Sequence, residues 1–316
     1  MLSRVAAQLY WMSRYLERAE NMARILDVGQ SLAMLSSHNG PREAAEAALE
    51  PLVITDTVAA FQATGRATRA DQVAQFLAWD ESHPSSIVNC IKTSRENARA
   101  VRGAMTAEMW ECINDTWMGL MQRQSASRGR KPAADTAFFE WVKERSHLFR
   151  GVTFATIQRD QPYHFIRLGT HIERADNTAR ILSVKTRVQR EGGTDLVDDY
   201  YRLGAVLRSV SALEAYRDTY RDAINPDRVA ELLIFNPGFP RSLLFCTDIS
   251  RQILDRLPQR SGRMARRHAA ELLAKLQFGS LQEVYASGLE TYLENFVKDT
   301  IALANAVHTD YLETLA

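Results

Sequence analysis

A segment of fourteen residues occurs twice in this chain. The first copy is Tyr15–Val28, the second copy is His171–Val184, and the two lie 156 residues apart. Nine of the fourteen positions are identical, and the shared residues are, in order, Glu, Arg, Ala, Asn, Ala, Arg, Ile, Leu and Val. Self-similarity at a fixed offset indicates a repeated structural unit, so this duplication constrains the fold more than any other feature.

The same offset relates other parts of the chain. Segment 70–77 matches segment 226–233 when 156 is added to each number. Two units of this size nearly fill the 316 residues. We therefore expect one domain, 1–316, that consists of two tandem repeats related by a pseudo-twofold axis. The expected repeats are 1–156 and 157–316.

Hydrophobic periodicity predicts an all-α protein. In the first expected helix the apolar residues fall within one arc at 100° per residue. These residues are Leu9, Met12, Leu16, Ala19, Ala23 and Leu26. Strand-like alternation is absent, and residues that favour helices are abundant. We expect a helical bundle of about ten or eleven helices. They cover 2–36, 42–64, 71–79, 84–123, 135–158, 162–190, 196–222, a short segment after Pro226, a segment from about 240 to Pro258, 262–277 and 280–314.

Composition indicates an ordinary globular protein. Hydrophobic residues make up 46% of the chain and charged residues 24%, and the formal net charge is +1. This balance gives no reason to expect binding to nucleic acid or to a membrane. Arg14, Glu17 and Arg18 interrupt the N-terminal segment too early for a signal peptide, and no apolar run approaches the ~20 residues of a membrane helix. We expect a cytoplasmic protein.

The three cysteines predict no disulfide framework. Cys90, Cys112 and Cys246 form no Cys-x-x-Cys pair, and Cys90 and Cys246 occupy matching repeat positions. Apolar neighbours surround both, which is typical of reduced core thiols in a cytosolic protein.

The duplicated segment places polar residues on one side of a helix. Glu17, Asn21 and Arg24 are spaced by four and three residues, so they share a face, and Arg18 lies about 100° away. One interpretation is a solvated face with weak neighbour pairs. A solvated face would tolerate exchange among polar types, yet the second copy keeps the same residues, which are Glu173, Arg174, Asn177 and Arg180. The planar fork of Arg and the amide of Asn suit buried networks, so we favour a polar network in which the two sets face each other.

Such a network could serve three purposes. Paired Arg and Glu residues could fix the register of the two halves. The arginines could instead bind an anionic ligand, with Arg18, Asn21 and Arg24 and their copies Arg174, Asn177 and Arg180 as binding residues. In the third case Glu17 or Glu173 would act as a general base.

A second polar cluster follows in the first repeat. Segment 94–99 reads Ser-Arg-Glu-Asn-Ala-Arg, with Arg95 and Arg99 four residues apart. These arginines are either surface pairs on an amphipathic helix or further ligand-binding residues. Trp110 and Trp117, which follow, are expected to pack in the core, and a docking face for a protein partner is the alternative.

The sequence contains no recognised catalytic motif and no metal-binding spacing. His164 and His171 are seven residues apart, which does not form a helical chelate, so we expect no metal and no cofactor. A homo-oligomer is compatible with this composition. These features favour a protein that is not an enzyme by itself.

Together, the two Glu-Arg helices and segment 94–99 running into Met109-Trp110 resemble the bacterial alpha-E family over essentially the whole chain. The resemblance implies an all-helical fold and no established activity. Members are typically encoded beside circularly permuted ATP-grasp proteins and transglutaminase-like proteases. It thus implies a partner or accessory protein of an ATP-grasp amide-forming system, which would offer its polar groove to an anionic peptide-like ligand. The alternatives are a free-standing enzyme that uses Glu17 or Glu173, and a purely structural scaffold.

Overall fold

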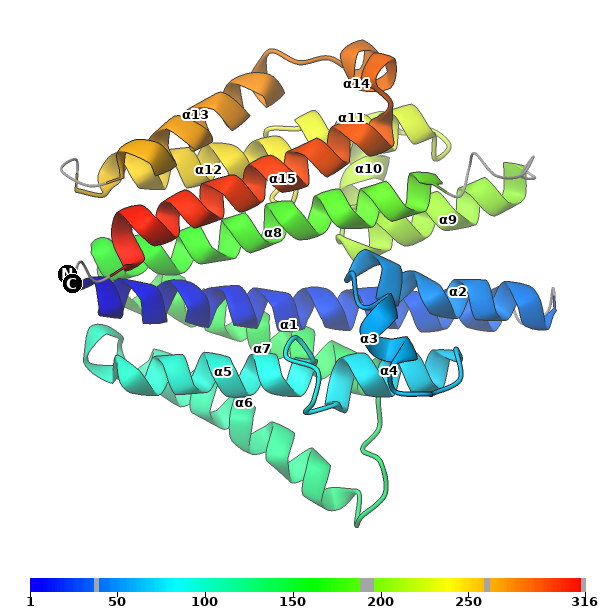
Figure 1. Ribbon diagram of the computed structural model, residues 1–316, viewed down its shortest axis with the longest axis horizontal. Coiled ribbons are helices and arrows are strands. Elements are labelled where there is room, and N and C mark those ends of the chain that lie inside the picture. The colour runs from blue at the N-terminus through cyan, green and yellow to red at the C-terminus, as the bar shows by residue number, and fades with distance from the viewer. Residues whose placement is uncertain (37–39, 188–195, 259–261, 314–316) are drawn as a thin grey trace. The chain divides into compact units, whose positions relative to one another are not determined.

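The structure, a computed structural model, describes residues 1–36, 40–187, 196–258 and 262–313. Within these residues it contains fifteen α-helices and no strand, which confirms the all-α prediction (Figure 1). The chain divides into two compact units. Unit 1 comprises Met1 and Gln8–Gly169, and unit 2 comprises Leu2–Ala7 and Thr170–Ala316.

The helices follow one another along the chain with short connections. The first seven are α1 (Ser3–Ser36), α2 (Pro41–Ile54), α3 (Val58–Gln62), α4 (Ala70–Trp79), α5 (Ile87–Ala100), α6 (Ala107–Ala126) and α7 (Thr136–Thr156). The other eight are α8 (Gln161–Arg187), α9 (Leu196–Ser209), α10 (Leu213–Tyr220), α11 (Pro226–Phe235), α12 (Leu243–Arg256), α13 (Arg263–Gln277), α14 (Leu281–Ser287) and α15 (Leu289–Val307). The expected end of the 162–190 helix lies outside the described residues.

Two of the long helices expected in unit 1 are interrupted. The segment 42–64 forms α2 and α3, because Asp56 adopts a left-handed backbone conformation (φ 55°) between them. The segment 84–123 forms α5 and α6, separated by a 3-10 turn at 102–104. Thr106 then starts α6 by accepting a hydrogen bond from the Met109 backbone N–H. The single helix expected over 84–123 is therefore two helices.

Two long helices expected in unit 2 are interrupted in the same way. The segment 196–222 forms α9 and α10, with Ser211 in a left-handed conformation (φ 53°). The segment 280–314 forms α14 and α15, with Gly288 at φ 83° between them, and a short π-helix over 308–312. These four breaks account for the difference between the eleven helices expected and the fifteen present.

Several helices of the two units share bounds at the offset found in the sequence. Both bounds of α11 lie 156 residues after those of α4, and both bounds of α12 lie 156 residues after those of α5. The capping is also repeated. Ser86 and Ser242 each accept a hydrogen bond from a backbone N–H in the first turn of α5 and α12, respectively. Matching residues therefore start matching helices.

Helix α1 lies in the core of unit 1. All six residues of its predicted apolar stripe are buried. The buried Ser94 side chain of α5 donates a hydrogen bond to the Met12 carbonyl oxygen (3.0 Å), which fixes α5 against one side of α1. Because other helices cover other sides, few positions of α1 remain available to solvent.

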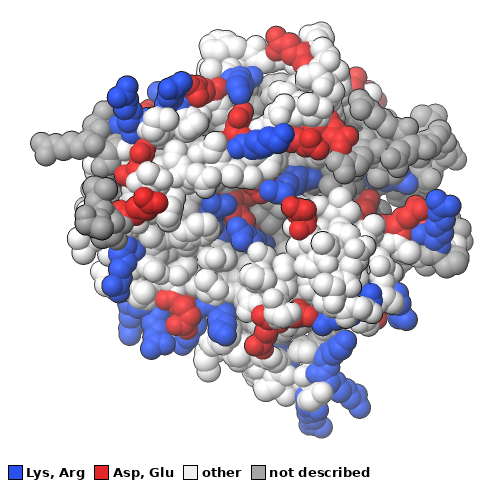
Figure 2. Space-filling view, viewed as in Figure 1, with Lys and Arg blue, Asp and Glu red and all other residues white. Residues whose placement is uncertain are grey.

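Two further predictions concern the burial of the cysteines and the absence of a membrane-spanning helix. All three cysteines are buried thiols outside any disulfide, as expected. Over the described residues, no helix combines the length and the apolar character needed to span a bilayer. Acidic and basic side chains are interspersed over the face shown in Figure 2.

Candidate functional site

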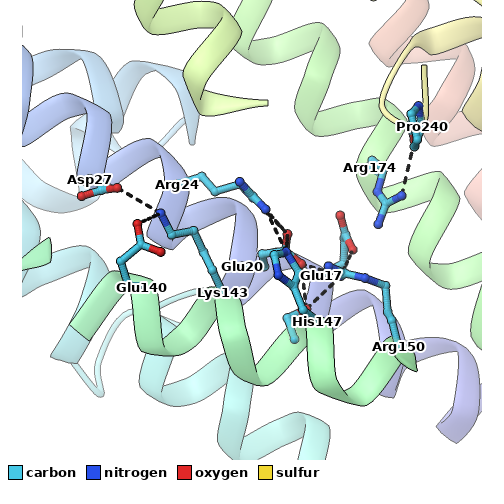
Figure 3. A network of polar contacts seen from close by, with 11 residues as sticks. Glu17, Glu20, Arg24, Asp27, Glu140, Lys143, His147, Arg150, Arg174 and Pro240 are labelled. Carbon is cyan, nitrogen blue, oxygen red and sulfur yellow. Dashed lines mark hydrogen bonds and ion pairs between the residues drawn. The ribbon is translucent and has the colours of Figure 1, made fainter. Parts of the chain in front are cut away.

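A set of charged and polar side chains connects α1 with α7 in unit 1 (Figure 3). We call it the α1–α7 polar seam. It consists of Glu17, Glu20, Arg24 and Asp27 from α1 and Lys143, Ser146, His147 and Arg150 from α7. In each helix these residues recur at intervals of one or two turns, so they line one side of the helix. The seam contains three carboxylates, all on α1, and three cations, which are Arg24 of α1 and Lys143 and Arg150 of α7.

Glu20 lies at the centre of the seam and is fully buried. Its Oε1 accepts a hydrogen bond from Arg24 Nε (2.9 Å), one turn further along the same helix. Its Oε2 accepts hydrogen bonds from the Ser146 hydroxyl (2.7 Å) and from Arg150 Nη1. Both oxygens of this carboxylate are therefore occupied by protein donors, as an ionised buried carboxylate requires.

Glu17, the glutamate of the first Glu-Arg motif, shares the same guanidinium. Its side chain is 1% exposed, and its Oε2 accepts a hydrogen bond from Arg150 Nη1 (3.0 Å). Arg150 is 30% exposed and also donates to the Ser146 hydroxyl oxygen (2.9 Å). One arginine of α7 thus holds both carboxylates of α1.

A further ion pair continues the seam along α1. Lys143 Nζ lies 3.0 Å from Asp27 Oδ2 and 2.5 Å from Glu140 Oε1. The lysine is only 12% exposed, so its charge depends on these two carboxylates rather than on water. The seam therefore extends over about three turns of α1.

His147 is the member of the seam most open to solvent, at 54% exposure. Its Nε2 lies 3.1 Å from Arg24 Nη2 and 3.4 Å from Glu20 Oε1. An arginine can only donate, so the contact with Arg24 requires a lone pair on Nε2.

The motif arginines hold equivalent turns in the two units. In unit 1, Arg18 Nη1 donates to the Ser85 hydroxyl oxygen (3.3 Å), just before α5. In unit 2, Arg174 Nη1 donates to the Pro240 carbonyl oxygen (3.3 Å), just before α12. Pro240 matches Pro84, the residue before Ser85, at the offset of 156. Each motif arginine therefore fixes the turn that precedes the matching helix.

The later residues of the motif also match. Arg180 Nε donates to Asp176 Oδ2 (2.8 Å), one helical turn apart, as Arg24 does to Glu20. Asn21 is buried, whereas Asn177 is half-buried. Glu173 is buried like Glu17. The solvated-face interpretation is therefore wrong, because α1 is covered by α5 and α7. The expectation that the two sets face each other stays a prediction.

The second predicted cluster has partners of its own. Arg95 Nε donates to Asn114 Oδ1 (3.0 Å), and Arg95 Nη1 donates to Glu96 (3.0 Å). Arg99 Nη1 lies 3.6 Å from the other oxygen of Glu96. In the described part of the chain, neither arginine bonds to the seam. The two predicted clusters are thus separate features of unit 1.

The sequence interpretation missed the centre of the seam. Glu20 is not among the predicted site residues. Its counterpart Asp176 is nevertheless also acidic and is also followed four residues later by an arginine. That retained acid was the available signal. Ser146, His147 and Arg150 have no such signal, because the helix that would supply their counterparts carries different residues.

A buried histidine lies beside the motif arginine of unit 1. His83 stacks on Phe76 with ring centroids 4.8 Å apart, and its buried Nε2 has no hydrogen-bond partner among the described residues. Burial lowers the pKa of His83; nearby Asp80 raises it and the Arg18 guanidinium lowers it further. The ring is therefore neutral at physiological pH.

No group of three or more His, Cys, Asp or Glu side chains that could hold a metal ion occurs within the described residues. The arrangement supports charge pairing between helices rather than coordination. Chemically, it offers buried, saturated carboxylates with one partly exposed imidazole at the edge.

These observations define a class of protein. It is an all-α protein in which the arginine of each Glu-Arg motif holds a neighbouring turn. The chain matches, over residues 1–312, the family described as a predicted alpha-helical domain with a conserved ER motif, and it belongs to this alpha-E family.

Longer relatives contain a similar segment. Uncharacterised proteins of Mycobacterium bovis and Mycobacterium tuberculosis are each 28% identical to this chain over 318 residues, which covers 92% of it. The chain spans only 34% of the length of these relatives. No solved structure matches the chain.

Proposed function

We propose that this protein is a non-catalytic partner of a bacterial ATP-grasp amide-forming system. In this proposal it supplies a binding surface and the partner supplies the chemistry. The link to an ATP-grasp ligase comes from the alpha-E family, whose members are encoded beside such enzymes.

The observation that carries this proposal is the state of the two buried carboxylates of α1. Glu17 and Glu20 share the Arg150 guanidinium, and Glu20 also binds Arg24 and Ser146. A general base needs a free lone pair within reach of its substrate. Carboxylates held in this way stabilise the packing of α7 on α1, so they support a structural role for the motif.

The length of the relatives supports a partner role. In the mycobacterial proteins the matching segment is about a third of the chain, since the match covers 34%. In these relatives the matching segment is joined to other sequence in one polypeptide. We infer that a segment of this kind works together with other protein domains.

The two units suggest how the fold arose. We propose that the chain consists of two tandem copies of one helical module related by a pseudo-twofold axis. The equal bounds of α4 and α11 and of α5 and α12, at an offset of 156 residues, support this proposal.

An anionic peptide-like ligand remains part of the proposal. The motif residues Arg18, Asn21 and Arg24, with Arg174, Asn177 and Arg180, are its proposed binding residues, and Arg95 and Arg99 form a separate proposed site. Replacing Arg18 with Lys keeps the charge but loses the fork that reaches Ser85. Loss of ligand binding with an unchanged fold would support a ligand site. A loss of stability alone would support the scaffold alternative.

A free-standing enzyme is the second candidate, and the partly exposed His147 favours it. The imidazole reaches from solvent to within 3.4 Å of Glu20, an arrangement that could relay a proton.

The two candidates separate in one experiment. The tagged chain is purified from its native host, and ATP-dependent amide formation is measured for the captured ligase with and without the chain. We expect stimulation of the ligase and no turnover by the chain alone. Turnover by the chain alone that is abolished in Glu17→Gln or Glu173→Gln would favour the enzyme, and the absence of any associated ligase would refute the partner proposal.

A further inference from the structure

One side of α5 and of the turn after it carries a row of four cations. They are Lys92, Arg95, Arg99 and Arg102. At 100° per residue the three on α5 fall within an arc of about 60°, and Arg102 lies in the 3-10 turn that follows. Arg95 is half-buried and the other three are exposed. Figure 2 shows Lys and Arg side chains gathered at the lower left of the view, over the region where Figure 1 places α5.

Two tryptophans of α6 extend this row. The Arg95 guanidinium carbon lies 5.9 Å from the ring centroid of Trp110 and 6.0 Å from that of Trp117. The Arg102 guanidinium carbon lies 5.3 Å from the centroid of Trp110. Trp110 and Trp117 are both half-buried. We define the Arg–Trp face as Lys92, Arg95, Arg99, Arg102, Trp110 and Trp117.

Unit 2 repeats the helices but not this face. The positions 156 residues after the four cations are Asp248, Arg251, Asp255 and Pro258, and those after the two tryptophans are Arg266 and Leu273. Arg251 forms an ion pair with Asp255 (3.1 Å) on its own helix. Because matching helices carry different surface residues, the Arg–Trp face is not a requirement of the helical framework.

The charge of the face is only partly neutralised. Arg95 and Arg99 share one carboxylate, Glu96. Lys92 and Arg102 form no ion pair within the part of the chain that the structure describes. The acidic residues of α6, which are Glu108, Glu111 and Asp115, lie about 100–180° around that helix from the two tryptophans. The face is therefore net positive, and these acids lie on another side of α6.

We propose that the Arg–Trp face is the docking site for an acidic segment of a protein partner, in which carboxylates flank an apolar side chain. The carboxylates pair with Lys92, Arg99 and Arg102, and the apolar side chain packs on the indoles of Trp110 and Trp117. Trp and Arg are the residue types that most often dominate the binding energy of protein interfaces. This inference rests on the proposed partner role and names the surface that the partner uses.

A protein segment fits the face better than an extended polyanion does. Nucleic acid binding is driven by many phosphate contacts and is typical of domains with an isoelectric point above about 9. This chain has an isoelectric point near 7.8.

Binding of defined probes to the purified full chain tests the proposal. The first probe is a fluorescein-labelled peptide of repeated Glu-Glu-Leu-Ala, and the second has Ser in place of Leu. An oligonucleotide and vesicles containing phosphatidylserine represent the other anionic partners. The test variant is Arg99→Gln with Arg102→Gln. The control variant, Arg42→Gln with Arg267→Gln, removes two exposed arginines that pair with Glu46 and Glu271.

We expect the Leu peptide to bind with a Kd below about 100 μM and more tightly than the Ser peptide. The test variant should weaken binding about tenfold, and the control variant less than about twofold. Equal weakening in both variants, equal affinity for the oligonucleotide or the vesicles, or no peptide binding would overturn the proposal. If one of these results is obtained while a ligase still associates with the chain, the docking site is refuted. The partner role then remains intact.

Discussion

The last long helices of the two units, α7 and α15, bury side chains at the same spacing but differ in their polar residues. The buried residues of α7 include Phe139, Val142, Ser146, Phe149 and Thr153, and those of α15 are Leu293, Phe296, Thr300, Leu303 and Val307. The two series have the same spacing, with an offset of 154 residues. The polar positions between them differ. Lys143, His147 and Arg150 of α7 correspond to Val297, Ile301 and Ala304 of α15.

The two units share several contacts of the duplicated motif, but they differ in the residues of the last long helix. Both units retain a buried Glu, a motif Arg that fixes the next turn, and an acid–Arg pair one turn apart. Of these two helices, only α7 carries basic side chains at these positions. Identical residues in two copies therefore do not imply identical neighbours.

The largest expected difference in stability between the two units concerns their acidic residues. Glu20→Gln leaves Arg24 and Arg150 without their shared buried carboxylate, so we expect a loss of about 3–5 kcal/mol of unfolding free energy. The matching Asp176→Asn removes one partner of a half-exposed pair on a single helix, so the loss should be below about 1 kcal/mol. Urea denaturation of both variants measures the contrast. Equal losses would show that the seam adds nothing to unit 1.

The buried hydroxyls offer a smaller contrast. Ser146 donates to Glu20 and accepts from Arg150, whereas the hydroxyl of Thr300 has no hydrogen-bond partner among the described residues. Ser146→Ala should cost about 1–3 kcal/mol, and Thr300→Val should be near neutral or stabilising. The two melting temperatures, measured side by side, check this. A destabilised Thr300→Val would reveal a partner for that hydroxyl.

The smallest expected effect concerns His83, whose counterpart in unit 2 is Phe239. The pKa of His83 is lowered in the fold, mainly by burial. As pH falls through about 6.5, the unfolded ring takes up a proton before the folded ring does, so stability is lost toward acid. His83→Phe should remove that loss, which is at most about 1.4 kcal/mol per pH unit.

Denaturation at about pH 7.5 and about pH 5.5 measures the effect. His308→Gln, which changes a half-exposed imidazole, is the control and should keep the wild-type pH dependence. A His83→Phe variant with the same pH dependence as the wild type would contradict the assignment.

Much of the helical plan could be predicted from the sequence, because it depends on local periodicity. The apolar stripe of α1 and the caps at Asp135 and Asn225 are examples of local signals. The missed breaks at Asp56 and Ser211 depend on left-handed residues without glycine, which local propensity does not reveal.

The polar seam could be predicted only on its α1 side. Burial of Glu17, Asn21 and Arg24 followed from the unchanged residue types in the duplicate. Their partners on α7 lie more than a hundred residues away in the chain, and the second repeat does not preserve them, so no periodicity or self-match identifies them.

A double-mutant cycle between Glu20 and Arg150 tests the central claim most directly, namely that the seam is a structural pairing rather than a catalytic site. Unfolding free energies are measured for the wild type, Glu20→Gln, Arg150→Met and the double variant. We predict a coupling energy of about 2 kcal/mol or more, with the double variant less destabilised than the sum of the single ones. A coupling energy below about 0.5 kcal/mol would contradict the claim, because it would mean that these buried charges do not depend on each other.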